Sequence, residues 1–308
     1  MQTILSFPAL PGMAYPRLEG TGLLRIVGQP SEILQLPAVS RNAIRIFMTS
    51  ASRGCSAEAI AALPNLGLVV SQGAGTELLD LAGLAAKHIQ LRCVGEALTD
   101  DVADLAITLT HMLHRDLLRA DGFVRSGQWQ RGRFELGHSV VGKTMGIAGL
   151  SGRIGQAIAA RATVARMNIA GIDRPSNAGL KAALYKDWAE LAAASDVLVL
   201  ALPGTAELTH MIGTKELAAL GRNGRLINVG RGNLVDTDAL IAALENNVIA
   251  GAALDVLDTE PAVPPQLAAL SNVILTPHIG GQTWGQRARG ALIAEDAILA
   301  FLNSGAHA

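Results

Sequence analysis

The chain has 308 residues and a formal net charge of −1; hydrophobic residues make up 50% of it and charged residues 17%. This length exceeds one ordinary hydrophobic core, so we expect two domains, and the apolar content is sufficient to fill both. The near-neutral charge and the 3% aromatic content argue against nucleic-acid binding, because the chain offers neither a basic field nor many stacking platforms.

The termini and cysteines indicate a protein of a reducing compartment. Cys55 and Cys93 cannot build a disulfide framework and lack metal-ligand spacing, so we expect reduced thiols. The segment Met1–Phe7 has no basic region of the kind that opens a signal peptide. No apolar run reaches the length of about 18 residues that a membrane span needs. We therefore expect a soluble, cytoplasmic protein without a membrane partner.

Short apolar runs alternate with helical patterns along the chain, which is typical of an α/β fold with mostly parallel sheets. In the first third, Ser56 is expected to cap a helix, Ala57–Leu63, that Pro64 ends. The loop Gly73–Gly75 lets a ligand approach the backbone closely. The predicted strands of this region are Ala43–Met48, Leu66–Val70 and Ile89–Val94.

A longer amphipathic helix is predicted next, with Thr99 as its N-cap and acidic Asp100 and Asp101 in its first turn. His111 and His114 lie on this helix, but a zinc site needs at least three ligands, so an exposed or capping role is favoured. Polar sequence from 121 to 142 then leads to a new unit. The apolar face of the helix comprises Val102, Leu105, Ala106, Leu109, Met112, Leu113 and Leu117.

From residue 144 a pattern of strand, glycine loop and helix repeats, which predicts a doubly wound domain. Thr283 is expected to cap a last helix, and the following Trp284 either lines a pocket or packs in a core. Because this helix must bury its apolar face, we expect it to dock on the first domain. The predicted strands are Met145–Ala148, Asn168–Ile172, Val197–Leu202, Arg225–Val229, Ala250–Val256 and Val273–Leu275. The apolar residues of the last helix are Ala291, Leu292, Ala294, Ile298 and Leu302.

These patterns predict a discontinuous small domain, residues 1–97 and 284–308, around a dinucleotide-binding domain, residues 98–283. The glycines Gly149, Gly152 and Gly155 follow a strand and precede a helix, predicted as Gln156–Ala165. In that context a dinucleotide pyrophosphate binds at the helix N-terminus. One extra residue separates the first two glycines compared with the usual G-x-G-x-x-G spacing. A purely structural turn is the alternative.

The next strand ends in Asp173, about 20 residues further on, where a carboxylate can bind the ribose hydroxyls of a dinucleotide. Its charge would repel a 2′-phosphate, which favours NAD. Arg174 could nevertheless receive a 2′-phosphate, so NADP stays open. The segment 137–144 has the spacing of a P-loop, but a strand follows it where a P-loop requires a helix, so we reject ATP binding there.

Three residues with ionisable side chains each follow a predicted strand of the second domain: Arg231, Glu260 and His278. Each alone could be a solvated loop residue. Together, at the carboxyl edge of one sheet, they suit an enzyme that holds an acid and protonates a neighbouring oxygen. A guanidinium can bind a carboxylate through two parallel hydrogen bonds. A histidine beside a carboxylate can carry a proton near neutral pH.

From about Pro64 onward the sequence resembles the D-isomer-specific 2-hydroxyacid dehydrogenases, and among them the glyoxylate/hydroxypyruvate reductase branch. The motifs that carry the resemblance are Gly73–Gly75, Leu98–Asp104, Gly127–Trp129, Gly142–Thr144, the glycine loop, Asn228–Gly232, Leu254–Val256 with Glu260–Pro261, and Thr276–Gly281. The resemblance implies a Rossmann domain inserted in a flavodoxin-like substrate domain, a substrate cleft between the two, and a homodimer.

The resemblance also implies the roles of individual residues. Arg231 would hold a small 2-oxo acid, His278 would donate the proton with Glu260 as its partner, and backbone amides of Ala74 and Gly75 would bind the substrate carboxylate. The cofactor would be NAD, with NADP open, and hydride transfer would join it to the 2-oxo acid or the D-2-hydroxy acid. The cofactor-binding residues would be Gly149, Gly152, Arg153, Ile154, Gly155, Asp173, Leu202, Pro203, Val229, Gly230, Asp255 and Gly280.

Two alternatives stay open at this point. One is an NAD(H)-binding interaction protein on the same scaffold, similar to the transcriptional co-repressors related to this family. The other is a phosphoglycerate- or formate-type dehydrogenase. The particular 2-oxo acid and the physiological direction cannot be read from these motifs.

Overall fold

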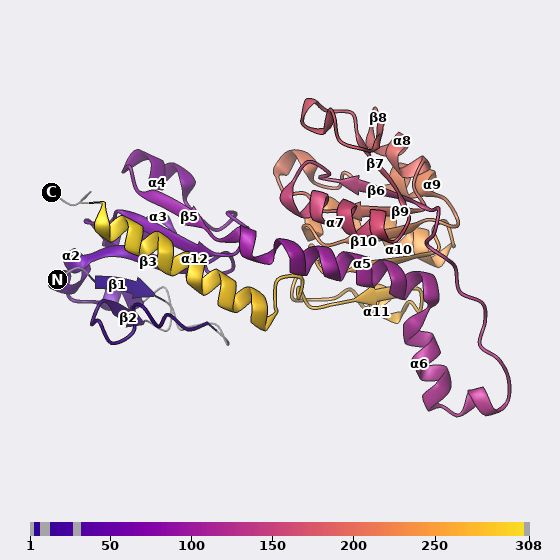
Figure 1. The fold of residues 1–308 in the computed structure, drawn as a ribbon, viewed down its shortest axis with the longest axis horizontal. Helices are drawn as coiled ribbons and strands as arrows, with labels where there is room; N and C mark the ends of the chain where they lie inside the picture. The colour runs from indigo at the N-terminus through magenta and orange to yellow at the C-terminus, as the bar shows by residue number, and fades with distance from the viewer. Residues whose placement is uncertain (1–2, 7–12, 27–31, 305–308) are drawn as a thin grey trace. The chain divides into compact units, whose positions relative to one another are not determined.

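The computed structural model describes residues 3–6, 13–26 and 32–304, so parts of the ranges predicted for the small domain lie outside the described residues. The chain divides into two compact units, Met1–Leu98 with Gly281–Ala308 and Thr99–Gly280. Each unit is built on its own parallel sheet (Figure 1).

The first unit contains a five-stranded sheet in the order β2-β1-β3-β4-β5, with every pair parallel. This order is that of flavodoxin-like sheets. The predicted fold class is therefore confirmed for this unit, although its first two strands were not predicted. The strands are β1 (Thr3–Ser6), β2 (Leu24–Ile26), β3 (Ile44–Ser50), β4 (Leu68–Gln72) and β5 (Gln90–Cys93).

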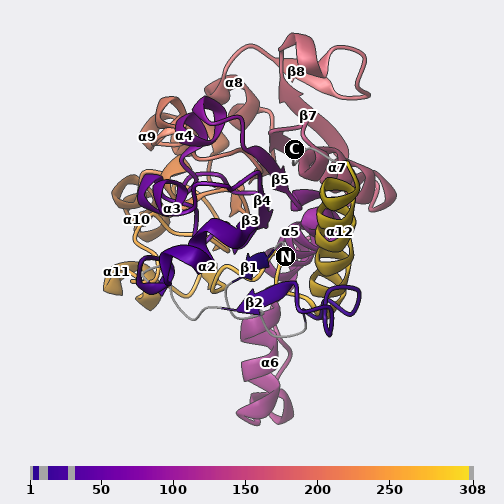
Figure 2. The same ribbon diagram turned by 90° about the vertical axis from the view of Figure 1, so that its left-hand side faces the viewer.

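Helices cover both faces of this sheet (Figure 2). Apolar side chains of α1, α3 and α4 share one buried cluster with the sheet, and those of α12 share the other. Ser56 caps α3 by accepting a hydrogen bond from the Ala59 amide, as predicted. The helices are α1 (Glu32–Gln35), α2 (Ala38–Ala43), α3 (Ala57–Ala62), α4 (Leu81–Ala86) and α12 (Trp284–Asn303), with a 3-10 turn, η1 (Gly95–Leu98).

The N-cap predicted for α12 is confirmed, but part of its predicted apolar face is wrong. The Thr283 side chain accepts a hydrogen bond from the Gln286 amide. Leu292 is 53% exposed, so its assignment to the apolar face was wrong, and Phe301 lies in the core instead. Trp284 is 74% exposed, which excludes the core-packing alternative within this chain.

The second unit contains a seven-stranded parallel sheet in the order β12-β11-β10-β9-β6-β7-β8. The chain order reverses between β6 and β9, which is the switch point of a Rossmann fold. The predicted fold class is confirmed here too, but β8 was missed. The strands are β6 (Thr144–Ala148), β7 (Asn168–Ile172), β8 (Ala183–Tyr185), β9 (Val197–Leu200), β10 (Arg225–Asn228), β11 (Gly251–Leu254) and β12 (Val273–Leu275).

Both faces of this sheet are also covered. On one face α5 (Thr99–Arg115) packs against α7 (Arg153–Val164), and Arg161 of α7 forms ion pairs with Asp100 and Asp104 of α5. The other face carries the larger apolar cluster. Its helices are α8 (Trp188–Ala193), α9 (Thr214–Leu220), α10 (Thr237–Glu245) and α11 (Pro265–Ala269).

The predicted start and end of α5 need correction. Thr99 is the first helical residue rather than the cap, because η1 runs directly into the helix, and its buried hydroxyl has no hydrogen-bond partner among the described residues. The helix stops at Arg115, since Asp116 adopts left-handed backbone angles. Leu117 consequently begins a new helix, is 45% exposed, and does not extend the buried face.

Helix α6 (Leu117–Arg125) and the returning segment form an arm, defined here as residues 117–141. The arm extends away from the seven-stranded sheet in both Figure 1 and Figure 2. The ring of Phe123 meets that of Phe134 edge-on at 5.4 Å, and the Arg119 guanidinium lies 5.5 Å from the Phe134 ring centre. None of the α6 residues is buried. The segment predicted as polar connection thus begins as a helix.

His114 lies buried near the opposite ends of the strands from the predicted catalytic loops. It is 1% exposed, and burial, with the nearby charge of Arg225, lowers its pKa from 6.5 to about 4. Its Nδ1 lies 2.9 Å from the Thr110 carbonyl, so the neutral ring donates there. The exposed position predicted for His114 is therefore wrong. Among the described residues, no group of three or more His, Cys, Asp or Glu side chains could hold a metal ion.

The pKa of His114 predicts a pH dependence of stability. The unfolded chain binds a proton at this ring below about pH 6.5 and the folded chain only near pH 4, so acid favours unfolding across that window. We expect the free energy of unfolding to fall by about 2 kcal/mol from this group between pH 7 and pH 5. Urea titrations of the wild type and His114→Gln at both pH values measure it. Equal pH dependence in the two proteins would contradict the assignment.

Candidate active site

The three predicted catalytic loops leave adjacent strands at one edge of the seven-stranded sheet. Strands β10, β11 and β12 are neighbours and parallel, so their carboxyl ends lie side by side. Arg231 follows β10, Glu260 follows β11 and His278 follows β12. This is the edge at which open α/β sheets bind their ligands.

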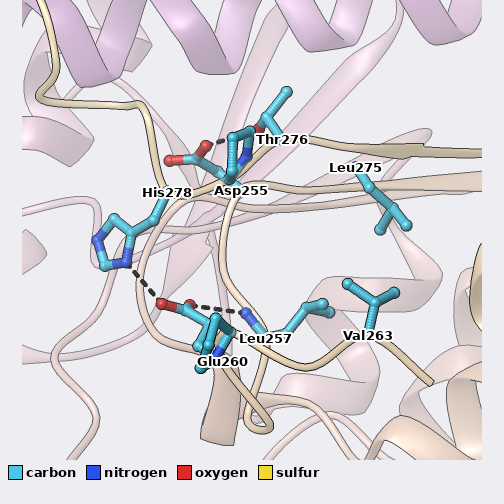
Figure 3. A pocket seen from close by; sticks show the side chains of 9 residues that line it. Asp255, Leu257, Glu260, Val263, Leu275, Thr276 and His278 are labelled. Carbon is cyan, nitrogen blue, oxygen red and sulfur yellow. Dashed lines mark hydrogen bonds and ion pairs between the residues drawn. The ribbon is translucent and has the colours of Figure 1, made fainter.

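The structure brings Glu260 and His278 into direct contact (Figure 3). The ring atom Nδ1 of His278 lies 2.9 Å from Oε2 of Glu260. The second oxygen of Glu260 accepts a hydrogen bond of 2.9 Å from the Leu257 amide, which fixes the carboxylate. The side chains of His278 and Glu260 are 51% and 39% exposed, so a ligand can reach the imidazole.

The loop that carries His278 is held by the buried carboxylate of Asp255, which is 2% exposed. One oxygen accepts hydrogen bonds from the Thr276 hydroxyl at 2.6 Å and the Ile279 amide at 2.8 Å. The other oxygen accepts from the Gly280 amide at 2.8 Å. His278 itself has a φ of 53°, a left-handed conformation that costs energy for a non-glycine residue. The Asp255 bonds on both sides of it hold that conformation.

A pocket of about 260 Å³ adjoins the Glu260–His278 pair. Apart from the polar groups of the Glu260 and His278 loops, its wall is apolar, as Figure 3 shows for Val263 and Leu275. The lining residues are Asp255, Leu257, Glu260, Pro261, Val263, Leu275, Thr276, Pro277 and His278.

Arg231 lies on the adjacent loop, half-buried, and is not among the described residues that line this pocket. Its Nη1 donates to the Gly230 carbonyl at 2.8 Å, and its own carbonyl accepts from the Asn228 side chain at 2.8 Å. The neighbouring Gly232 touches the backbone of Leu257, where a Cβ would come within 1.9 Å. The Arg231 and Glu260 loops are therefore in contact through their backbones.

The glycine loop after β6 fits a dinucleotide. Gly149 has a φ of 98°, and a Cβ on Gly155 would lie 2.1 Å from the Gly149 carbonyl oxygen, so side chains are excluded where the loop meets the helix. The Gly152 amide donates to the Gly149 carbonyl at 3.0 Å, which closes a turn around the extra residue. Gly152, the N-cap of α7, provides no side-chain cap, which suits an anion at this helix end.

Helix α7 begins at Arg153, three residues before the predicted start, so Arg153 and Ile154 lie in its first turn. Arg153 is exposed there. A helix N-terminus carries partial positive charge and donor amides, and a nearby guanidinium adds full charge. These residues fit the diphosphate group of a dinucleotide.

The remaining predicted cofactor residues occupy the same sheet edge. Asp173 follows β7 and is exposed, while Val229 and Gly230 follow β10 and are buried. A Cβ on Gly230 would lie 2.8 Å from the Leu202 carbonyl oxygen, and one on Gly280 would lie 3.0 Å from Oδ2 of Asp255. These glycines therefore allow close packing of loops. Pro203, after β9, is exposed.

The predicted substrate-binding loop belongs to the first unit. It follows β4, and Gly73 has a φ of 120°, which a residue with a side chain rarely adopts. Ala74 is exposed, and Gly75 is buried.

Sequence reasoning missed the contribution of Thr276 and the full role of Asp255. The Thr276 hydroxyl and two amides donate to a carboxylate that the resemblance gave only as a cofactor-binding residue. A buried acid directly after an apolar strand was the available signal, because such an acid needs several donors.

A family model, "D-isomer specific 2-hydroxyacid dehydrogenase, NAD binding domain", matches residues 107–280. The chain is 42% identical over 261 residues to glyoxylate/hydroxypyruvate reductase A of Arabidopsis thaliana, covering 85% of this chain and 83% of that protein. It is 39% identical over 266 residues to a glyoxylate reductase of Thermococcus gammatolerans, covering 83% of this chain and 79% of that protein.

Solved structures agree in fold. The 2-hydroxyacid dehydrogenase of Ketogulonicigenium vulgare matches with a TM-score of 0.89 and 31% identity, over 98% of this chain and 96% of that one. An NADPH-dependent glyoxylate/hydroxypyruvate reductase of Sinorhizobium meliloti, solved with NADP and malonate, matches with a TM-score of 0.87 and 32% identity, over 99% and 95%.

The fold and the glycine loop define an NAD(P)-dependent oxidoreductase. More specifically, the chain belongs to the D-isomer specific 2-hydroxyacid dehydrogenase family, which confirms the resemblance noted in its sequence. Within the described segments no helix has the length and apolar character needed to cross a membrane.

The bonds of Asp255 lead to a stability prediction. Asp255→Asn keeps the shape but places an NH₂ group where one oxygen accepts from the backbone, so a buried donor loses its partner. We expect the free energy of unfolding to fall by about 1–3 kcal/mol, measured by chemical denaturation. Thr276→Val removes only the hydroxyl bond and should cost less. An Asn variant as stable as the wild type would contradict the role of this carboxylate.

Proposed function

We propose that the enzyme reduces a small 2-oxo acid to the D-2-hydroxy acid, with His278 as the acid and base. The hydrogen bond between His278 and Glu260 carries the proposal. Because a carboxylate only accepts, the Nδ1 proton of His278 is directed to Glu260, and Nε2 is the atom that exchanges a proton with the substrate. When bound, the nicotinamide supplies a hydride to the keto carbon.

Arg231 is proposed to bind the substrate and to stabilise negative charge that develops on its carbonyl oxygen. With Glu260 accepting at Nδ1, protonated His278 donates its other proton from Nε2 to the same oxygen. In the oxidative direction neutral His278 takes the proton as a base. The backbone amides of Ala74 and Gly75 are proposed to bind the substrate carboxylate.

The cofactor contacts are proposed on the same basis. The first turn of α7, with Arg153 and Ile154, binds the pyrophosphate, and Asp173 binds the adenosine ribose. The other contacts proposed are Gly149, Gly152, Gly155, Leu202, Pro203, Val229, Gly230, Asp255 and Gly280. Glyoxylate and hydroxypyruvate are the proposed substrates. The basis is that the two relatives described above are named glyoxylate/hydroxypyruvate reductase A and glyoxylate reductase. We further propose a cytoplasmic location.

The test is a kinetic comparison of His278→Asn with His88→Asn. Both residues are exposed histidines in left-handed backbone, with φ values of 53° and 54°, and asparagine tolerates that conformation. With NADH and glyoxylate or hydroxypyruvate, we expect the His278 variant to lose about 10²–10⁴-fold in turnover, because the proton donor is gone. The control variant should keep the wild-type rate.

Nucleotide affinity separates a catalytic from a structural role. Binding of NADH, followed by its fluorescence, should stay within about twofold of the wild type in the His278 variant, since the proton donor acts on the substrate. Strong loss of NADH binding would contradict the assignment. Nucleotide binding by the wild type without turnover on any small 2-oxo acid would instead favour an interaction protein on this scaffold.

We also propose that the enzyme is a homodimer and that the arm contributes to the contact. The arm exposes large apolar side chains that nothing in its own unit covers, including Leu118 at 56%, Trp129 at 67% and Leu136 at 97%. Several large apolar side chains exposed on one segment indicate an interaction surface. A helix with no buried residue gains its stability elsewhere, and a second copy supplies that surface.

Light scattering coupled to size exclusion tests the dimer. The wild type should elute with twice the 32.0 kDa mass of the chain. Leu118→Glu with Leu136→Glu should shift the mass toward the monomer, because a buried unpaired charge is costly. Val164→Glu, at an 85% exposed position on α7, is the control and should stay dimeric. A monomeric wild type would exclude the proposal.

A further inference from the structure

The end of β7 places two opposite charges next to each other at the proposed ribose site. Asp173 and Arg174 directly follow the strand and are both exposed. The Asp173 amide donates to the Tyr185 carbonyl at 2.7 Å, so this backbone is tied to β8. Arg174 has extended angles, φ −139° and ψ 151°, and successive side chains of an extended chain point to opposite sides.

The Arg174 side chain lies on the side of α8. Its guanidinium carbon is 5.3 Å from the centre of the Trp188 ring, within the range of a cation–π interaction. Trp188 is the first residue of α8 and packs against the apolar core of the unit. The preceding Asp187 caps the helix by accepting from the Glu190 amide at 2.9 Å. Core packing and the cap thus hold the residue that the guanidinium contacts.

The glycine loop adjoins the end of β7. A Cβ on Gly171 of β7 would lie 2.7 Å from a methyl carbon of Leu150, and the hydroxyls of Ser151 and Ser176 are 3.1 Å apart. Ser176 belongs to the 3-10 turn η3 (Pro175–Asn177) that follows Arg174. A dinucleotide whose pyrophosphate lies at this loop brings its adenosine ribose to the end of β7.

We propose that Trp188 sets the preference for NAD over NADP by holding the Arg174 guanidinium away from the ribose. With Arg174 bound to the Trp188 ring, the carboxylate of Asp173 meets the ribose with its charge uncompensated and repels a 2′-phosphate. Released from the ring, Arg174 can turn toward the ribose, offset that charge and bind a phosphate through its planar donor groups. This inference rests on the nucleotide site proposed above and makes Trp188 a positioning residue.

The test measures binding, not turnover, with ADP-ribose and 2′-phospho-ADP-ribose as probes in calorimetric titrations. We expect the wild type to bind ADP-ribose more tightly. Trp188→Leu keeps an apolar side chain but has no ring face, and its affinity for the 2′-phosphorylated probe should rise about two- to fivefold, the range that loss of an exposed cation–π contact allows. Affinity for ADP-ribose should not change.

Two further variants isolate the pair. Trp188→Phe retains an aromatic face and should behave more like the wild type than the leucine variant does. Adding Arg174→Ala to Trp188→Leu should abolish the gain, while Arg174→Ala alone should leave the affinity for the 2′-phosphorylated probe nearly unchanged. Arg174 is exposed, so its removal does not disturb the core.

Each result that contradicts an expectation shows which part of the proposal is wrong. Weaker binding of the 2′-phosphorylated probe by Trp188→Leu would mean that the ring presents Arg174 to the phosphate, which overturns the proposal. A gain that survives in the double variant would do the same, because Arg174 would not cause it. Failure of both probes to bind the wild type would overturn the nucleotide site itself. Binding without reduction of any 2-oxo acid would contradict the proposed reaction and leave the probe result valid.

Discussion

The hydrogen bonds of the buried Asp255 carboxylate are the interaction on which the arrangement of the Glu260 and His278 loops depends. It gathers a hydroxyl and two amides of the loop after β12, and so holds His278 in a backbone conformation that is unfavourable in isolation. A buried charge is tolerated only when donors surround it, and here the donors belong to the segment that must be ordered. The donors that offset the free-energy cost of burying Asp255 are thus the groups that position the His278 imidazole, which Glu260 contacts.

The parallel sheet sets where these groups meet. Strands β10, β11 and β12 are consecutive neighbours, so three loops distant in the chain leave the sheet at one edge. Glycines then allow these loops to approach more closely than side chains would permit, as at Gly232 against Leu257 and at Gly230 against Leu202. On the other side of the switch point the glycine loop and the uncapped end of α7 provide donors for an anion. One edge therefore carries both the hydrogen-bonded His278 and Glu260 and the uncapped end of α7.

The sequence predicted the strands of the second unit well, because apolar runs bounded by glycine and proline leave few alternatives. It failed where tertiary context overrode local pattern. Leu117 fits the helical period of α5, yet Asp116 turns the chain and exposes it. Strand β8 has only three residues, too few to stand out in the sequence, and pairing with β7 creates it. In α12, Gln286 and Glu295 are buried although polar, which no periodicity in hydrophobicity could indicate.

The sequence by itself determined the fold class and the glycine loop, and it named Arg231, Glu260 and His278 as candidates, because these depend on residue type and on order along the chain. Only the tertiary structure decided the contact between Glu260 and His278 and the position of Arg231 on the neighbouring loop. It likewise revealed the triple engagement of Asp255 and the stacking of Arg174 on Trp188. Contacts between residues distant in sequence follow from strand order and loop packing, and a single sequence does not encode these in any local pattern.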